Sequence, residues 1–250
     1  MTREKNSLPL AAVALAGLWL GAGAPGWAAT PFGEANIFLE LNDTDGDLGL
    51  HALIDGDPWK ELELESPGGG EKLRVTTNGS MRNHGLTELF FESAEPPFDE
   101  LSPSAFFRRF PAGTWEISGI TIDGEELEST DLLRHVLAAP PENVAVSGVT
   151  AAENCDVVPL PSVSEPVVIS WDPVTGSHPE IGRTGKIKVV RYELIVEREG
   201  ARFSVELPPE VTEFELPEDF TGLADEFKFE IIVREASGNQ TAIESCFEIE

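Results

Sequence analysis

The sequence is poor in basic residues, and this scarcity excludes several kinds of partner. Its 250 residues contain 17 Lys and Arg against 45 Asp and Glu, which gives a formal net charge of −28 at pH 7. Proteins that bind nucleic acid need Lys and Arg to contact phosphates, so this charge argues against nucleic acid and against anionic membrane surfaces. It fits a soluble protein, or one that holds divalent cations.

Motifs that carry chemistry are also missing. The histidines have no metal-binding spacing such as HxH or HExxH; they are His51, His84, His135 and His178. No GxSxG elbow, phosphate-binding loop or paired-cysteine zinc motif occurs. A glycosidase needs two placed carboxylates, and among 45 acidic residues the sequence selects no pair. We therefore expect a protein that is not an enzyme, with a secreted carbohydrate-active hydrolase that uses carboxylates of the N-terminal half as the alternative.

Long apolar runs are absent except near the N-terminus. The uncharged segment Leu8–Ala24 follows Arg3 and Lys5 and precedes small residues around Trp27. This order is typical of a secretory signal peptide, here residues 1–28, and the run is shorter than the ~20 residues of a membrane-spanning helix. No later segment is apolar enough to cross a bilayer, so the sequence predicts a secreted or periplasmic protein.

Cysteine is scarce as well. In an exported protein, an even pair such as Cys155 and Cys246 indicates a disulfide. A bridge that closes so long a loop would stabilise the fold by ~4–5 kcal/mol.

A segment of altered composition divides the chain. Residues 139–155, "APPENVAVSGVTAAENC", contain two prolines and few large apolar side chains, which predicts a linker. The linker separates a domain at 33–138 from a domain at 156–250, and the chain is long enough for two such cores.

Residues 156–250 alternate short β-type runs with turn signals, which is typical of a β-sandwich. The expected strands are 166–171, 188–198, 201–207, 212–217, 226–235 and 242–249. Within the fifth of these, Phe227, Phe229 and Ile231 alternate with polar residues, so one face of that strand should be buried.

Three segments of this half resemble a known family. "ISWDP" (Ile169–Pro173) resembles the second strand of a fibronectin type III domain, "RYELIVE" (Arg191–Glu197) resembles the third, and "EFKFEIIVREASGNQT" (Glu226–Thr241) is similar to the sixth strand and its loop. The resemblance implies an immunoglobulin-like sandwich over residues 156–250. Phe227 departs from the family, which usually has a tyrosine there whose hydroxyl forms a hydrogen bond. The overall layout resembles exported bacterial proteins that carry a fibronectin type III domain, and this likeness implies no activity.

Residues 33–138 are also mainly β. The expected strands are 35–42, 48–54, 59–65, 72–77, 86–92, 115–122 and, in preference to a helix, 127–137. Leu101–Phe110 predicts one short helix, with Ser102 as its N-cap and Pro103 at its first position. The predicted fold class is therefore all-β: a β-sandwich or jelly-roll-like domain with one short helix, followed by a fibronectin type III sandwich.

The stretch "ELNDTDGDLGLH" (Glu40–His51) is the first candidate site. Alternating aspartates supply the oxygen ligands that calcium prefers, but Leu48 and Ile54 occupy places where an EF-hand needs Gly and Glu. Asp-Gly is also the commonest hairpin signal, so a solvated turn is the alternative. The candidate calcium ligands are Asp43, Asp45, Asp47 and, from the next turn, Asp55.

Two loops of the second half form the other candidate site. In the fibronectin type III layout, the loop 172–186 lies beside the loop 236–241 at one end of the sandwich. Basic residues are concentrated near the first loop and would suit an anionic partner or an acidic neighbouring domain, although such bases can also simply offset nearby acids. The candidate binding residues are His178, Arg183, Lys186, Lys188 and Asn239.

These observations favour an exported, non-catalytic binding or interaction module of the cell envelope or extracellular space. Its ligand would be a protein or a carbohydrate, and exposure of Trp59 or Trp115 would favour carbohydrate. A purely structural spacer is the remaining alternative. Fold alone does not decide among these functions.

Overall fold

The computed structural model describes residues 29–250, so the predicted signal peptide lies outside the described residues. Within the described range, no helix is both long and apolar enough to span a membrane. The elements of the first half are β1 (Glu34–Asn42), β2 (Asp47–Glu65), β3 (Glu71–Thr76), α1 (Met81–His84), β4 (Leu86–Glu92), α2 (Pro103–Arg109), β5 (Gly113–Thr121) and β6 (Glu126–Leu133). Those of the second half are β7 (Ala145–Val146), β8 (Val149–Thr150), β9 (Ser162–Val163), β10 (Val168–Ser170), β11 (Val189–Arg198), β12 (Ala201–Leu207), β13 (Glu213–Glu215), α3 (Glu218–Thr221), β14 (Glu226–Glu235) and β15 (Gln240–Ile249).

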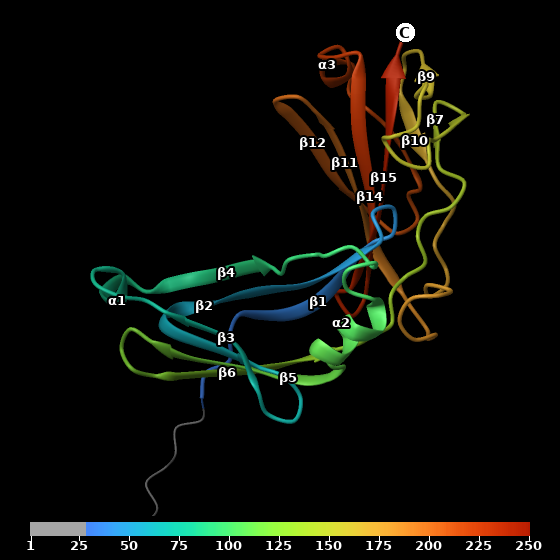
Figure 1. Cartoon of the computed structure of the whole chain (residues 1–250). Helices are drawn as coiled ribbons and strands as arrows, with labels where there is room; N and C mark the ends of the chain where they lie inside the picture. Colours follow the sequence, from blue (N-terminus) through green and yellow to red (C-terminus); the bar gives the residue numbers. More distant parts are fainter. Residues whose placement is uncertain (1–28) are drawn as a thin grey trace, which may run out of the picture.

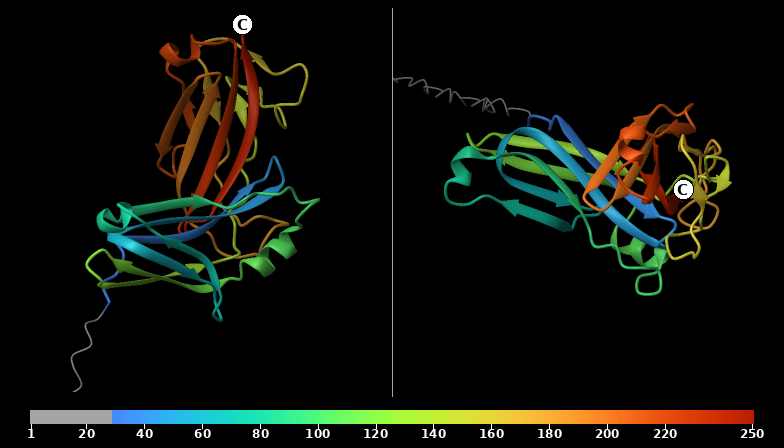
Figure 2. Two further views of the ribbon diagram at one scale, coloured as in Figure 1. Left: turned by 60° about the vertical axis from the view of Figure 1, so that its left-hand side comes forward. Right: turned by 90° about the horizontal axis from the view of Figure 1, so that it is seen from above.

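One sheet runs through both halves. Its strand order is β12-β11-β14-β15-β1-β2-β5-β6, and β1 joins β15 in parallel, with Glu40 opposite Gln240 and Asn42 opposite Ala242. The two halves meet at a steep angle (Figures 1 and 2). The sheet is therefore bent. We use the term inner corner for its concave side, which has β1, β2 and β4 on one wall and β11, β14 and β15 on the other.

The first half has its own core on the opposite face of β1 and β2. Ile37, Leu39 and Leu41 alternate toward this core, where Trp59 and Trp115 are fully buried. The strands predicted at 48–54 and 59–65 are one long strand, β2, with register shifts between Asp55 and Trp59. The segment 127–137 is a strand, as predicted, only as far as Leu133, since β6 spans Glu126–Leu133.

The predicted short helix is confirmed as α2. Pro103 occupies its first turn and Ser102 its N-cap position, but the Ser102 side chain caps no backbone N–H and lies 3.3 Å from Ser104 Oγ instead. Phe106, 1% exposed, packs into the core with its ring 4.9 Å from that of Phe110. The helix therefore closes one end of the first core.

The second half is a β-sandwich of two sheets. The sheet β13-β10-β7-β8 packs on β12-β11-β14-β15, and the core between them holds Trp171, Tyr192 and Phe227. Phe227 stacks on Phe247 with ring centroids 5.5 Å apart. The hydroxyl of Tyr192 accepts a hydrogen bond from Val174 N at 2.9 Å. The all-β prediction is confirmed.

The segment predicted as a linker, 139–155, contains β7 and β8. Val146 of β7 pairs with Ile169 of β10 and is fully buried, so this segment is part of the second sheet. The linker was predicted because segment 139–155 has few large apolar residues, but strands of only two residues need very few apolar side chains. The predicted disulfide between Cys155 and Cys246 is confirmed, with the two Cα atoms 4.9 Å apart, and it ties the end of this segment to β15.

Candidate functional site

The aspartate-rich stretch forms the turn between β1 and β2. The side chain of Asn42 accepts hydrogen bonds from Thr44 N at 3.1 Å and Asp45 N at 3.2 Å, which caps the turn. Asp47 pairs with Asn42, whereas Asp55 pairs with Glu34 at the far end of the ladder. Asp47 and Asp55 are thus roughly 26 Å apart along an extended strand. The four candidate calcium ligands do not converge in this arrangement.

Asp43 contacts the second half of the protein instead. Its Oδ1 lies 2.8 Å from Nε2 of His178, a residue that is 7% exposed. Nδ1 of His178 accepts hydrogen bonds from Glu180 N and Ile181 N, so Nε2 carries the proton and donates it to Asp43. His178 therefore fastens the loop 172–186 to the turn between β1 and β2.

Asn239 is a second connection between the halves. Its Oδ1 accepts a hydrogen bond from Leu39 N, and its Nδ2 donates to Arg134 O and Val136 O, each at 2.9 Å. Asn239 is 1% exposed. Of the predicted binding residues, His178 and Asn239 are therefore structural, and the sequence could not separate this role from ligand binding.

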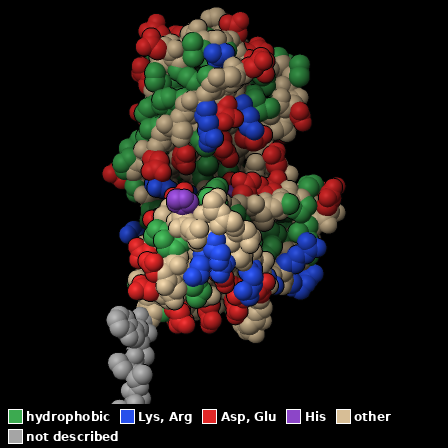
Figure 3. Space-filling model, turned by 90° about the vertical axis from the view of Figure 1, so that its left-hand side faces the viewer, with side chains coloured by type: hydrophobic (Ala, Val, Ile, Leu, Met, Phe, Trp, Pro, Cys, Tyr) green, Lys and Arg blue, Asp and Glu red, His purple; other side chains and the backbone are tan. Residues whose placement is uncertain are grey.

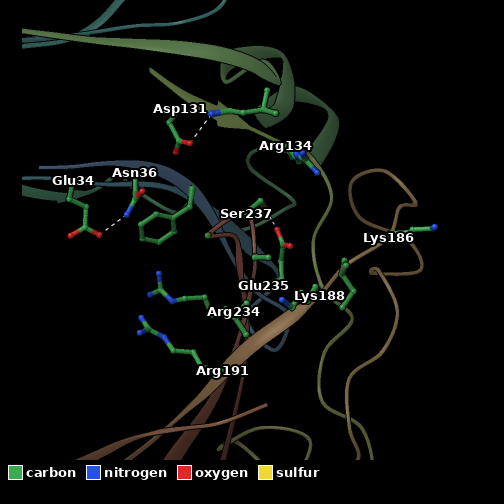
Figure 4. A pocket seen from close by; sticks show the side chains of 16 residues that line it. Glu34, Asn36, Asp131, Arg134, Lys186, Lys188, Arg191, Arg234, Glu235 and Ser237 are labelled. Carbon is green, nitrogen blue, oxygen red and sulfur yellow. Dashed lines mark hydrogen bonds between the residues drawn. The ribbon is translucent and has the colours of Figure 1, made fainter. Parts of the chain in front are cut away.

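Lys186 and Lys188, by contrast, line a pocket of about 1070 Å³ in the inner corner (Figure 4). We call it the basic pocket, because its lining includes Arg134, Lys186, Lys188, Arg191 and Arg234. Arg191 and Arg234 lie side by side on neighbouring strands and extend toward Glu34 and Asn36 of β1 (Figure 4). Arg183 is not part of the lining and lies beside His135, whose carbonyl accepts its N–H.

The positive charge of the basic pocket is only partly neutralised. Arg191 pairs with Glu206 at 2.9 Å, yet its Nε is buried and has no hydrogen-bond partner among the described residues. The guanidinium of Arg234 lies 5.2 Å from the centre of the Phe38 ring, a cation–π contact. Burial, and then the charge of Arg191, lower the pKa of Arg234. An anion in the pocket would offset the repulsion between Arg191 and Arg234.

Three basic side chains of the pocket are free of counter-ions. Arg134, Lys186 and Lys188 form no ion pair within 4.0 Å with any residue of the range 29–250. Glu34, Asp131 and Glu235 also line the pocket, but Asp131 accepts a hydrogen bond from Ile37 N and Glu235 from Ser237. The acids are thus partly engaged, and an anion could approach the free cations.

The other side of the inner corner is acidic. Its carboxylates come from both halves and are Glu40, Asp47, Glu92, Glu95, Glu230 and Glu244. Burial, and then neighbouring carboxylates, raise the pKa of Glu230 to about 7 and that of Asp47 to about 6. In the view toward the inner corner, acidic side chains gather along the junction, with Lys and Arg above and below (Figure 3). The corner is therefore electrically divided, basic at the pocket and acidic beyond it.

The tryptophans that a carbohydrate platform would need are not on the surface. Trp59 and Trp115 are both 0% exposed, and Trp115 Nε1 donates to Pro111 O at 3.0 Å. Both lie in the core of the first half, so the exposure that would favour a carbohydrate ligand is not found.

No family model matches the chain, and no curated protein matches its sequence. Among solved structures, it is similar to the FN1–FN3 domains of chicken CNTN1 (TM-score 0.35, 11% identity, 88% of this chain and 65% of that chain). It is also similar to a 1.5-MDa bacterial ice-binding adhesin (TM-score 0.24, 12% identity, 89% and 66%) and to the human OSCAR ligand-binding domain (TM-score 0.29, 12% identity, 88% and 98%). The chain spans just under two thirds of the length of the first two structures. At these values the likeness concerns the fold alone.

Proposed function

We propose that this protein is an exported, non-catalytic binding module whose basic pocket takes an acidic segment of a partner protein. The observation that carries the proposal is the gathering of Arg134, Lys186, Lys188, Arg191 and Arg234 around one pocket in a chain of net charge −28. Arg134, Lys186 and Lys188 are exposed and unpaired within the described range, so they can form charge-assisted hydrogen bonds to a carboxylate. Val190, which is 39% exposed, adds apolar surface for the rest of the segment.

The charge distribution supports selective docking at this one place. The predominantly acidic surface repels an anionic partner, whereas the pocket attracts it. Complementary potentials of this kind raise the association rate and suppress wrong orientations. The concave basic surface also favours a binding module over a structural spacer.

Export is supported by two independent features. The order of residues in 1–28 is that of a signal peptide. The disulfide between Cys155 and Cys246 requires an oxidising compartment. The periplasm and the extracellular space both meet this requirement.

A hydrolase has weaker support. A glycosidase needs two placed carboxylates in a cleft, whereas five basic side chains line the basic pocket, and its carboxylates Asp131 and Glu235 already accept hydrogen bonds. We therefore retain the binding function.

The proposal is tested by fluorescence anisotropy with a labelled glutamate oligopeptide. Wild-type protein should bind the peptide saturably, and more weakly as salt is added. The variant Lys186→Glu/Lys188→Glu should bind at least about tenfold more weakly, since two attractive contacts become repulsive. Both lysines are exposed, so the fold should not change.

The matched control is Lys72→Glu/Arg108→Glu, which alters net charge equally at exposed sites outside the pocket and should bind like wild type. Equal losses in the two variants would mean that only net charge matters and would contradict the site. Binding of heparin without binding of the peptide would contradict a protein partner and indicate an anionic polysaccharide.

A further inference from the structure

The inner corner contains a second cluster of side chains, on the wall formed by the first half. The cluster consists of His51 on β2, Glu92 on β4 and Glu95 just after β4. Each residue contributes one potential ligand atom, and these three atoms lie within 4.8 Å of one another. His51 Nε2 is 3.1 Å from Glu95 Oε1. The cluster therefore combines one imidazole nitrogen with two carboxylate groups.

Strand pairing and one glycine build this cluster. His51 and Glu92 are directly opposite each other in the β2–β4 ladder. Glu95 lies over Gly49, where an added Cβ would overlap the Glu95 carboxylate and come within 2.8 Å of His51 Nε2. Gly49 thus leaves the space through which Glu95 reaches the histidine, two residues along the strand.

The imidazole is held rigidly before any ligand arrives. The His51 side chain is 5% exposed, and its ring lies 5.3 Å from that of Phe38 and 6.2 Å from that of Phe90. A fixed nitrogen beside two adjustable carboxylates is a preorganised set of ligands, because only the carboxylates must move by small rotations.

We infer that His51, Glu92 and Glu95 form a binding site for a divalent transition-metal ion of the zinc type. Zinc accepts His nitrogen at ~2.0–2.1 Å and carboxylate oxygen at ~2.0–2.2 Å, and three protein ligands leave one position open. Calcium and magnesium prefer sites made of oxygen alone, so the histidine selects against them.

The surroundings supply further negative charge for a cation. Asp47 Oδ1, on the same side of the sheet, is a buried oxygen without a hydrogen-bond partner among the described residues. Glu40 lies directly opposite Gly49 across the β1–β2 ladder. A bound dication would offset this repulsion between carboxylates. This inference does not depend on the anionic partner of the basic pocket.

The test is a titration of the metal-free, full mature protein with zinc, followed by calorimetry and by thermal unfolding. We expect one zinc per chain. Free zinc at a hundredfold excess over its Kd should raise the melting temperature by about 5–10 °C. Cobalt in place of zinc should develop the visible absorption bands of a four-coordinate site.

Two variants separate ligation from folding. Glu92→Gln alters an exposed residue and should weaken zinc binding at least about tenfold without changing the metal-free melting temperature. Gly49→Ala should also weaken zinc binding, because its methyl group displaces Glu95. Glu88→Gln, on the same face of β4 and opposite Asp55, is the matched control and should bind zinc like wild type. The inference is overturned if wild type binds no zinc, or if Glu92→Gln and Glu88→Gln bind it equally.

Discussion

Replacing Asn239 by alanine should lower the free energy of unfolding by about 3–5 kcal/mol. The side chain is 1% exposed and joins three segments through hydrogen bonds to Leu39 N, Arg134 O and Val136 O, each 2.9 Å long. Alanine leaves these three backbone groups without their partner. Leu39 is fully buried, so water cannot replace the lost acceptor at its N–H.

The magnitude follows from the number of groups left unsatisfied. The buried Leu39 N–H costs ~1–3 kcal/mol when it loses its partner. Each of the two part-buried carbonyls costs about 1 kcal/mol, because water can partly replace the lost donor, so the sum is about 3–5 kcal/mol. Since whole domains are stable by only ~5–15 kcal/mol, the loss should be large in any unfolding experiment.

The assay is urea unfolding without reductant, followed by far-UV circular dichroism. Asn78→Ala is the control, because Asn78 is exposed and makes one local hydrogen bond, to Thr76 O. The control should stay within about 0.5 kcal/mol of wild type. If Asn239→Ala is equally harmless, Asn239 does not hold the two halves together and the reasoning is refuted.

Two further predictions concern the disulfide and the buried acids. Reduction of Cys155–Cys246, whose sequence separation is 91, should cost about 4.6 kcal/mol from chain entropy, and an unchanged urea midpoint after reductant would contradict this value. Burial, followed by the charge of Glu40, raises the pKa of Glu230 from 4.5 to about 7, so the folded state holds this proton more strongly than the unfolded state. The resulting stabilisation is present below pH 4.5 and is lost as the pH rises through 7. Between pH 5 and pH 8, the free energy of unfolding of Glu230→Gln should therefore fall by about 2 kcal/mol less than that of wild type. Urea unfolding at several pH values measures this difference, and parallel profiles for the two proteins would exclude this role of Glu230.

The parts of the fold that follow from local pattern were predicted from the sequence. The alternation of Phe227, Phe229 and Ile231 identified β14 within its observed bounds, Glu226–Glu235. Ser102 and Pro103 located the start of α2. Such signals lie within a few residues of one another, so no knowledge of the tertiary arrangement was needed.

The junction and the sites depend on contacts between distant residues. Leu39 and Asn239 are 200 positions apart, and no local pattern indicates that β1 and β15 pair in parallel. The basic pocket combines Lys188 with Arg134 and Arg234, and only the sheet order brings these together. The cluster around His51 likewise requires the pairing of β2 with β4, so the spacing of histidines alone could not identify it.

The most direct test of the central claim, that the basic pocket binds an anionic segment, is an NMR titration of isotope-labelled protein with the glutamate oligopeptide. We predict saturable shifts of the backbone amides of Phe38, Lys188, Arg234 and Ser237, all of which line the pocket. The amides of Lys72 and Arg108, which lie outside it, should not move. Shifts confined to other surfaces, or shifts that never saturate, would contradict the account.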